Sequence, residues 1–516
     1  MGSRGRRPES CKFGHPLYAG CWLEDGEYGE HGVVCVAGGG GRGSHGLANR
    51  VVLAALREEE GGEKKKTNTN TKKKKKKKKR KEEVHPLLEE IQGAVVVEDG
   101  LPCALAVRSR ARKPVASPTT TTTSSVSAGA GGGEEQQHNE QEEEELVCVT
   151  GARVLLLRVS RETDTGSSGD NGSAGVSLVC DDASGVKIGG KRSSSSTTKT
   201  EFKVAVFARG GSLLLLGDVD GTVHVLEWPG AVLVRALKVT GDAAAPPGKP
   251  KGEINHISVN EDGSHALVVC ESGPMTLWDI ERGELLASLP SAELSTDTKR
   301  ARGRFRSSAF FPGKHGHGVI VSFNDPNGGH LYKYLLPFVA STGDGNGVGA
   351  AKEKGGESRG WQKICHAKAQ ADPITAMALS SSGSLVATGS SEGDVAIFSA
   401  VDFSPMKRVK NAHMVFVTGL DFRTPKCTVE DESGEDMPIT TSPSGDTGVE
   451  TLLSISADSA ALVTVIDANR KRSAFETICI RLIILLLLLA LAFIAYCIHV
   501  VSIEIRGRRW NLPFEQ

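Results

Sequence analysis

The strongest candidate for a functional site in the sequence is Val33–Leu53, VVCVAGGGGRGSHGLANRVVL. Two apolar strands there flank a twelve-residue loop, Gly38–Asn49, which contains six glycines and is called the glycine loop below. Because glycine has no Cβ, the backbone amides and carbonyls of such a loop can converge on an ion or on a partner surface. Asn49 adds a side-chain carbonyl. A plain hairpin tip has a similar composition, so a functional loop and a structural one both stay open.

Nucleotide binding by the chain itself is not favoured. A phosphate-binding loop needs the pattern GxxxxGK[ST] between a strand and a helix. The glycine loop has no lysine, and valines and leucines follow it as in a strand. Gly185–Lys191 comes nearest elsewhere, but Arg192 occupies the position of the magnesium-binding hydroxyl and a serine run follows. The sequence therefore argues against a P-loop NTPase.

The remaining histidines and cysteines do not assemble a reaction centre. His315 and His317 flank a glycine in an expected turn, and His413 is expected to be structural. Cys365 and His366 form an isolated pair with no acid identified nearby. No Ser/His/Asp order, carboxylate pair or metal-ligand spacing is present, so we expect a protein that is not an enzyme. Eleven cysteines without a CxxC pair indicate neither a zinc framework nor a disulfide scaffold, which is typical of a reduced, cytosolic chain.

One strongly basic run, Lys72–Lys81, has ten consecutive Lys or Arg residues. Such a run could bind RNA or DNA, direct nuclear import or contact anionic lipid. The whole chain balances 62 basic against 62 acidic residues, which excludes a protein that is basic throughout. We favour a solvated loop insertion and expect no nucleic-acid partner.

A single segment predicts a membrane span. Leu482–Val501, LIILLLLLALAFIAYCIHVV, is apolar over 20 residues apart from His499. A helix of that length spans about 30 Å, the thickness of a bilayer core, whereas a buried helix of a soluble core rarely lacks a polar face. The N-terminus shows no apolar signal region, so we expect a tail-anchored chain with a transmembrane helix at 478–502 and a short lumenal tail at 503–516. Arginines flank both ends, and charge alone does not set the orientation.

A repeat of glycines predicts the fold of the rest. Three segments place a glycine, a second glycine ten residues later and a large apolar residue five further on: Gly211–Gly221–Leu226, Gly263–Gly273–Trp278 and Gly383–Gly393–Phe398. Each unit resembles a buried strand, a tight turn and an alternating strand. Four-stranded units of about 40–45 residues are typical of propeller blades. The sequence therefore predicts an all-β, seven-bladed WD40-like β-propeller at 1–477, and the fixed glycine spacing disfavours an open sandwich.

Seven blades can be assigned once polar, Gly- and Ser-rich stretches are set aside as disordered insertions. Those insertions are 57–86, 108–145, 161–200, 341–360 and 428–449. Five blades are expected at Lys203–Val239, Ile254–Leu289, Phe305–Leu336, Ile374–Val409 and Val415–Ile466. A degraded blade is expected at Leu87–Val159, and strands near Leu17–Trp22, Val33–Val36 and Arg50–Leu56 make the seventh. The last strand should pair with the N-terminus and close the ring, which removes exposed edges.

Several sequence motifs occur in an order that points to a known family. GGGG followed by GLAN comes first, then DGTVHVLEWP at Asp220–Pro229, HMVFVTGLDFRTP at His413–Pro425, LLSISADSAALV at Leu452–Val463 and the apolar helix. This combination resembles the Sec12-type proteins, called prolactin regulatory element-binding proteins in animals. The resemblance covers nearly the whole ordered chain, and the glycine loop together with the membrane helix is its more specific part.

The resemblance implies a guanine-nucleotide exchange factor, or guanine-nucleotide releasing factor, of the endoplasmic reticulum membrane. Such a protein promotes GDP release from a Sar-type small GTPase, which starts COPII vesicle coat assembly and ER-to-Golgi protein transport. It implies a single-pass chain with the propeller facing the cytosol. In that family the glycine loop is described as binding a potassium ion and engaging the GTPase, without any required cofactor. The matching positions here are Gly38, Gly39, Gly40, Gly41, Gly46, Leu47 and Asn49.

Two details of the match and two alternatives bear on this expectation. Leu47 stands where the family often carries Ile, and Ala48 where Pro is common. Asn49 is the candidate ligand of the implied potassium ion. The first alternative is a membrane-anchored WD-repeat scaffold without exchange activity, for which the glycine loop is a plain loop. The second is a nucleic-acid-binding regulator that uses Lys72–Lys81.

Overall fold

The computed structural model describes the β-strand framework and the C-terminal helix. The residues described are 10–23, 32–40, 47–57, 87–90, 95–97, 101–108, 144–150, 153–162, 175–181, 201–239, 252–271, 273–291, 294, 303–311, 318–337, 360–424, 449–467 and 474–509. By its internal contacts the chain divides into two units, one holding the strands and one holding the C-terminal helix.

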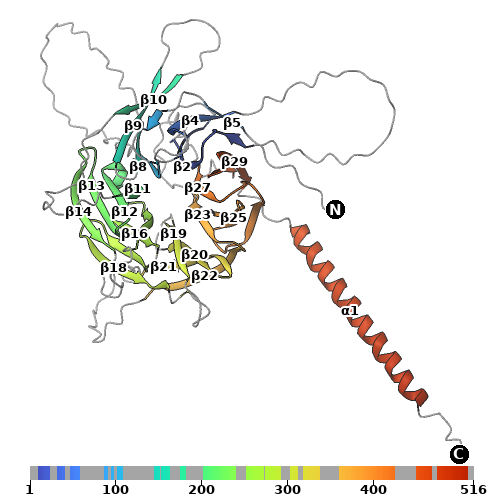
Figure 1. The fold of residues 1–516 in the computed structure, drawn as a ribbon. Coiled ribbons are helices and arrows are strands. Elements are labelled where there is room, and N and C mark those ends of the chain that lie inside the picture. The colour runs from blue at the N-terminus through green and yellow to red at the C-terminus, as the bar shows by residue number, and fades with distance from the viewer. Residues whose placement is uncertain are drawn as a thin grey trace, which may run out of the picture. The chain divides into compact units, whose positions relative to one another are not determined.

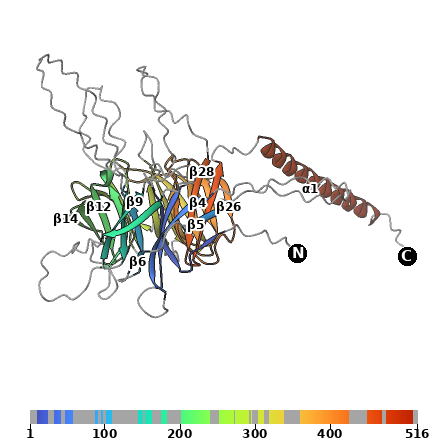
Figure 2. The same cartoon turned by 90° about the horizontal axis from the view of Figure 1, so that it is seen from above.

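The first unit is a seven-bladed β-propeller, which confirms the predicted fold class. Seven separate antiparallel sheets follow one another in a ring (Figure 1). In Figure 2 the ring is seen edge-on, with strands running between its two faces. The innermost strand of each sheet contacts the innermost strands of the sheets beside it, so the ring is closed.

Blades 1 to 3 come from the N-terminal half of the chain. Blade 1 consists of β2 (Leu17–Trp22), β3 (Val33–Gly38), β4 (Asn49–Arg57) and β5 (Leu87–Glu90), with β6 (Val95–Val97) also paired to β4. Blade 2 consists of β7 (Ala104–Val107), β8 (Glu144–Thr150), β9 (Arg153–Glu162) and β10 (Gly175–Asp181). Blade 3 consists of β11 (Phe202–Ala208), β12 (Leu213–Asp218), β13 (Thr222–Glu227) and β14 (Val232–Lys238), with the short 3-10 turn η1 (Arg209–Gly211) after β11.

Blades 4 to 7 complete the ring. Blade 4 consists of β15 (Ile254–Val259), β16 (His265–Cys270), β17 (Met275–Asp279) and β18 (Glu284–Leu289). Blade 5 consists of β19 (Arg304–Phe310), β20 (Gly318–Asp325), β21 (Gly328–Leu335) and β22 (Gln362–Gln370). Blade 6 consists of β23 (Ile374–Leu379), β24 (Leu385–Ser390), β25 (Val395–Ser399) and β26 (Pro405–Val409). Blade 7 consists of β27 (Val417–Phe422), β28 (Val449–Ser456), β29 (Ala460–Asp467) and β1 (Cys11–Lys12).

Blade 7 closes the ring as the sequence predicts. The N-terminal strand β1 pairs with β29, with Cys11 opposite Ala461 and Lys12 opposite Ala460. The backbone N–H of Phe13 continues this pairing by donating to the Ser459 carbonyl at 3.0 Å. Pairing of the two ends of the propeller covers a strand edge that would otherwise stay exposed.

The cores lie between neighbouring blades. Blades 1 and 2 share a cluster that includes Cys35, Leu53 and Leu146, while blades 1 and 7 share one that includes Trp22 and Ile455. The alternation of side chains along each strand sends one set to each neighbouring blade, so a strand buried on both faces reads as a continuous apolar run. This is the reason for runs such as VVCV in β3.

Local polar networks fix the turns. His413 is buried, its Nε2 lies 3.0 Å from the Ser454 hydroxyl, and its ring also lies beside Asp458. His413 is therefore structural, as expected. The turn glycines of the repeat, except Gly273, have positive φ, as the predicted tight turns require.

Three blade assignments differ from the prediction. Leu87–Glu90 and Val95–Val97 belong to blade 1, because the nine-residue β4 is long enough to pair with β5 near one end and β6 near the other. The expected disordered insertion 161–200 contains the end of β9 and all of β10, which completes blade 2. Blade 5 gains β22 as its outer strand. The other predicted insertions fall almost entirely outside the described residues.

The second unit contains the helix α1 (Ala474–Arg509), which extends beyond both ends of the expected span 478–502. Among the described residues it is the one helix long and apolar enough to cross a membrane, judged by length and composition. The apolar window is Leu482–His499, with a mean hydropathy of 2.8 and none of its surface buried. This C-terminal helix is a candidate membrane span.

Candidate functional site

The glycine loop joins β3 to β4 in blade 1. Gly38 ends β3 opposite Arg50 of β4, so both ends of the loop belong to one antiparallel hairpin. Gly41 and Gly46 lie outside the described residues, and the loop is described at 38–40 and 47–49. The structure therefore defines the base of the loop.

Gly38 is required by a close approach of two backbones. A Cβ on Gly38 would overlap the Pro16 carbonyl and lie 2.9 Å from Leu17 Cα. The N–H of Gly39 donates to that same Pro16 carbonyl at 3.0 Å. The connection between β1 and β2 thus holds the β3 end of the loop in place, a support that the sequence did not predict.

Oxygen atoms of the β4 end of the loop lie close to the backbone of Gly39. Its φ is +153°, and a Cβ there would lie 3.0 Å from the Ala48 carbonyl oxygen and collide with Asn49 Oδ1. At Gly40 a Cβ would lie 3.2 Å from the Leu47 carbonyl oxygen. Neutral carbonyl and amide oxygens are ligands that alkali cations accept. The loop base therefore places oxygen atoms of the type that such cations prefer beside Gly39 and Gly40.

Asn49 is buried at the start of β4, with 6% of its surface exposed. It stands opposite Val97 of β6 in the sheet. Strands on both sides of β4 thus hold this residue. β3 pairs with one edge of β4, where Gly38 stands opposite Arg50, and β6 pairs with the other edge. Because the backbone of Asn49 is held on both sides, this residue loses little conformational entropy when it binds a ligand.

His15 adds a buried titratable group beside the base of the loop. Its Nδ1 lies 2.8 Å from the Phe13 carbonyl oxygen. Burial lowers the pKa of His15; the hydrogen bond to the Phe13 carbonyl opposes this effect, and the charge of Arg50 adds to it. The imidazole is therefore neutral at pH 7 and adds no positive charge to the site.

The 47–48 end of the loop is accessible to solvent. Leu47 is 44% exposed and Ala48 is exposed, whereas Gly38 and Gly39 are buried. Val96, opposite Arg50 in β6, is 57% exposed. The hairpin therefore has a buried, tightly packed base and an apolar side chain directed outward, which is an arrangement suited to contact with another molecule.

Strand order places this loop on one particular face of the ring. Strands alternate in direction within a blade, so loops between second and third strands leave on the same face as the connections between blades. The glycine loop, the β1–β2 connection and the β26–β27 connection all lie on that face, which we call the loop face. Connections between third and fourth strands, such as β25–β26, lie on the opposite face.

Of the other candidate residues, Cys365 and His366 lie in a different blade from the glycine loop. Lys72–Lys81, Gly185–Lys191, His315 and His317 lie outside the described residues. Cys365 and His366 lie on β22, in blade 5.

The expectation of no acid near Cys365 and His366 is wrong for the histidine. His366 Nε2 lies 3.1 Å from His330 Nδ1, and His330 Nε2 lies 3.2 Å from Asp325 Oδ1. His366 also stacks on Tyr332 with ring centroids 4.4 Å apart. These residues lie on adjacent strands β20, β21 and β22, so this network ties blade 5 together.

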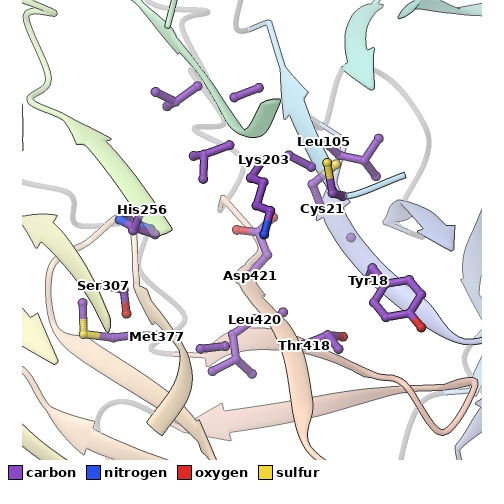
Figure 3. A pocket seen from close by; sticks show the side chains of 18 of the residues that line it. Tyr18, Cys21, Leu105, Lys203, His256, Ser307, Met377, Thr418, Leu420 and Asp421 are labelled. Carbon is purple, nitrogen blue, oxygen red and sulfur yellow. The ribbon is translucent and has the colours of Figure 1, made fainter. Parts of the chain in front are cut away.

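A central cavity of about 760 Å³ is lined by the inner strands of the ring. Figure 3 shows Lys203, His256 and Asp421 among the side chains around it. Lys203 is paired with Glu253, the residue just before the next inner strand, β15. Within the described residues no group of three or more His, Cys, Asp or Glu is arranged to hold a metal ion.

Two titratable groups of the cavity are shifted toward their neutral forms. Burial, with a smaller effect of the Arg306 charge, lowers the pKa of His256 to about 4. Burial raises the pKa of Asp421 to about 7, although the backbone N–H groups of Trp22 and Phe422 oppose it. Trp22 N–H donates to Asp421 Oδ2 at 2.8 Å, and the indole Nε1–H donates to the Asp421 carbonyl at 3.2 Å. These contacts join blades 1 and 7.

Comparison with curated proteins finds a limited similarity. SEC12-like protein 2 of Arabidopsis thaliana is 24% identical over 214 residues, which are 41% of this chain and 44% of that protein. The match thus spans less than half the length of this relative. No protein-family model matches the chain.

Solved structures give two further similarities. Sqt1 from Chaetomium thermophilum aligns with a TM-score of 0.45 and 13% identity, over 87% of this chain and 96% of Sqt1. Sqt1 bound to the N-terminus of ribosomal protein L10 aligns with a TM-score of 0.43 and 12% identity, over 88% and 99%. The propeller assignment rests on the seven sheets and their closed ring. The chain is a seven-bladed propeller protein with a candidate membrane span and partial similarity to a SEC12-like protein.

Proposed function

We propose that the chain is a guanine-nucleotide exchange factor for a Sar-type small GTPase, held at the endoplasmic reticulum membrane by α1 with the propeller in the cytosol. The observation that carries the proposal is the glycine loop, whose base is buried and fixed while Leu47 is exposed on the loop face. The partial similarity to SEC12-like protein 2 supports the same class of function.

Exchange of this kind needs no catalytic side chain. An exchange factor acts by binding the nucleotide-free GTPase better than the GDP-bound form. Each preference of about 1.4 kcal/mol shifts that equilibrium about tenfold. A rigid loop that fits only the nucleotide-free conformation supplies such a preference, and a fixed loop base lowers the entropy lost on binding.

A potassium ion at the glycine loop is part of the proposal. The oxygen atoms that would hold it are Asn49 Oδ1 and the carbonyls of Leu47 and Ala48, which lie beside Gly39 and Gly40. When bound, the ion would fix the 47–49 end of the loop through these oxygens. The chain's own residues then supply the contact surface, led by Leu47.

The membrane helix accounts for where exchange takes place. A single span keeps the propeller close to the bilayer, so nucleotide exchange occurs beside the membrane on which COPII coat assembly starts. The effective concentration of a tethered factor near its surface is far above that of a free one. The same chain thus supplies both the exchange activity and the membrane attachment.

Release of fluorescent GDP tests the proposal. Full-length chain in liposomes is added to a purified Sar-type GTPase, and release is followed with the parent, with Leu47→Asp and with Val232→Asp. Val232 on β14 is a matched control, because it is exposed (58%) and apolar but lies on the outer strand of blade 3. We expect faster release with the parent and the control, and loss of that acceleration with Leu47→Asp. Equal release with and without the parent chain would leave the scaffold alternative standing.

A further inference from the structure

A second apolar surface lies on the loop face, in the connection between β26 and β27. Met414, Val415 and Phe416 are consecutive and are 66%, 39% and 44% exposed. We call them the apolar segment. Exposing three neighbouring large apolar side chains to water is unfavourable, and contiguous exposed apolar surface in a folded protein often marks an interaction site.

The backbone of the apolar segment is fixed by the fold. Met414 N–H donates to Asp458 Oδ2 at 2.6 Å, and the Ser456 hydroxyl donates to the Phe416 carbonyl at 2.9 Å. His413, just before it, is buried, and its N–H donates to the Gly393 carbonyl at 3.0 Å.

Gly393 itself permits this arrangement. Its φ is +82°, and a Cβ there would lie 2.7 Å from the Val415 carbonyl oxygen. The segment is therefore a rigid backbone that carries exposed apolar side chains. Such a surface loses little conformational entropy when it binds, which is the property of an interaction hot spot.

A short chain of contacts connects the apolar segment to the glycine loop. Thr418, two residues after Phe416, donates its hydroxyl to the Leu17 carbonyl at 2.9 Å. The residue before Leu17 is Pro16, whose carbonyl accepts the N–H of Gly39. The apolar segment and the base of the glycine loop thus sit at the same end of two adjacent inner strands, β27 and β2. Both therefore belong to one region of the loop face.

The size of a stable interface argues for such a second contact. Specific protein–protein interfaces cover about 800 Å² on each partner, which exceeds what one hairpin tip offers. Charged and polar neighbours, among them Glu392, Lys410 and Asn411, are exposed around the apolar segment. An apolar centre with a polar rim is the usual anatomy of an interface.

We infer that Met414, Val415 and Phe416 form a second contact surface for the small GTPase, which binds the loop face through an apolar patch of its own. This inference rests on the proposed function. The glycine loop would then select the nucleotide-free form, while the apolar segment contributes affinity and orientation.

The test uses full-length chain in liposomes with the double variant Met414→Asp/Phe416→Asp, and with Phe416→Ala as a variant that adds no charge. Val401→Asp is the matched control, because Val401 is 67% exposed and lies in the β25–β26 connection on the opposite face of the neighbouring blade. Affinity for nucleotide-free Sar-type GTPase and the rate of GDP release are measured, together with the thermal midpoint.

We expect the double variant to bind at least about tenfold more weakly and to release GDP correspondingly more slowly, and Phe416→Ala to act in the same direction. Val401→Asp should match the parent, and all midpoints should agree, because the altered side chains are exposed. Less than a twofold loss of affinity in both variants, with Leu47→Asp still abolishing exchange, would overturn the inference and leave the proposed function intact.

Two other outcomes also overturn the inference. A parent chain that neither binds the GTPase nor accelerates GDP release refutes the proposed function, and the inference falls with it. A parent that sediments as a dimer, with a monomeric double variant and unchanged GDP release, assigns the apolar segment to contact between two copies of this chain instead.

Discussion

Replacing Asp421 by asparagine should remove a pH dependence of stability that this carboxyl imposes on the propeller. Burial in the central cavity raises the pKa of Asp421 from 3.8 to about 7. Because the folded state holds this proton more tightly than the unfolded chain, stability is highest below about pH 4 for this group and falls as the pH rises toward 7. Asparagine keeps an oxygen that can accept the Trp22 N–H but carries no charge.

The magnitude follows from the two pKa values. The interval from 3.8 to about 7, at about 1.4 kcal/mol per pKa unit, corresponds to about 4 kcal/mol at most. Because Asp421 is only half-buried by its exposed surface, solvent screens the carboxylate, and we expect about 2 to 4 kcal/mol between pH 4 and 8. Asp421→Asn should match the parent near pH 4 and exceed its stability above pH 7 by that amount.

Urea unfolding of the full-length chain in detergent, followed by tryptophan fluorescence, measures the difference between pH 4 and 8. Trp22 is a local reporter because its indole N–H donates to the Asp421 carbonyl. Asp402→Asn is the control, since hydrogen bonds from Ser404 lower the pKa of the exposed Asp402 and its effect has the opposite sign. A constant difference between parent and Asp421→Asn across this pH range would refute the reasoning.

Further predictions concern the loop, blade 7 and the ion. Gly38→Ala should reduce GDP release by about tenfold or more, because its Cβ overlaps a carbonyl, whereas Gly230→Ala, with its nearest neighbour at 3.6 Å, should not change it. Although burial opposes it, hydrogen bonds from the neighbouring histidine and a backbone N–H lower the pKa of Asp458 to about 2. Asp458→Asn should therefore lower the thermal midpoint at pH 7, with a cost that shrinks as the pH falls below about 4. Potassium should raise the thermal midpoint above its value in sodium, and Asn49→Ala should abolish that difference; equal midpoints for the parent in both salts would contradict the ion site.

The blade repeats were predictable because turns are local. The expected boundaries Ile254–Leu289 and Ile374–Val409 coincide with the first and last residues of blades 4 and 6. Glycines such as Gly263 and Gly383 take positive φ in the turns, and that requirement is visible in the sequence. Where the glycine repeat is present, sequence and structure agree closely.

Outer strands were less predictable because a single partner strand supports them. β10 and β22 are the outermost strands of their blades, and each pairs on one side only within its sheet. β22 is largely exposed, so its sequence QKICHAKAQ lacks the apolar run of an inner strand. β10 lies in a Ser- and Gly-rich stretch that resembled an insertion, although Val176, Leu178 and Cys180 alternate with other residues.

The candidate site was predictable only in its local part. Gly38 and Asn49 mark the two ends of the loop because a glycine run between apolar strands is a contiguous pattern. The support from Pro16 and the nearby apolar segment depend on contacts such as Thr418 with Leu17, which are 401 residues apart in the chain. No local pattern predicts such a contact. The sequence signal for the apolar segment was the run of three apolar residues, Met414–Phe416, directly before β27.

Pairing of β1 with β29 has a consequence for how the protein is made. Cys11 and Lys12 leave the ribosome early, whereas their partners Ala461 and Ala460 are translated near the end. At about 5–20 residues per second, the nascent chain waits tens of seconds before its first strand finds that partner. Translation reaches α1 within a few residues of β29, so the closing strand and the candidate membrane span are synthesised in the same short interval. The N-terminal strand therefore stays without its partner strand for most of the time that synthesis takes.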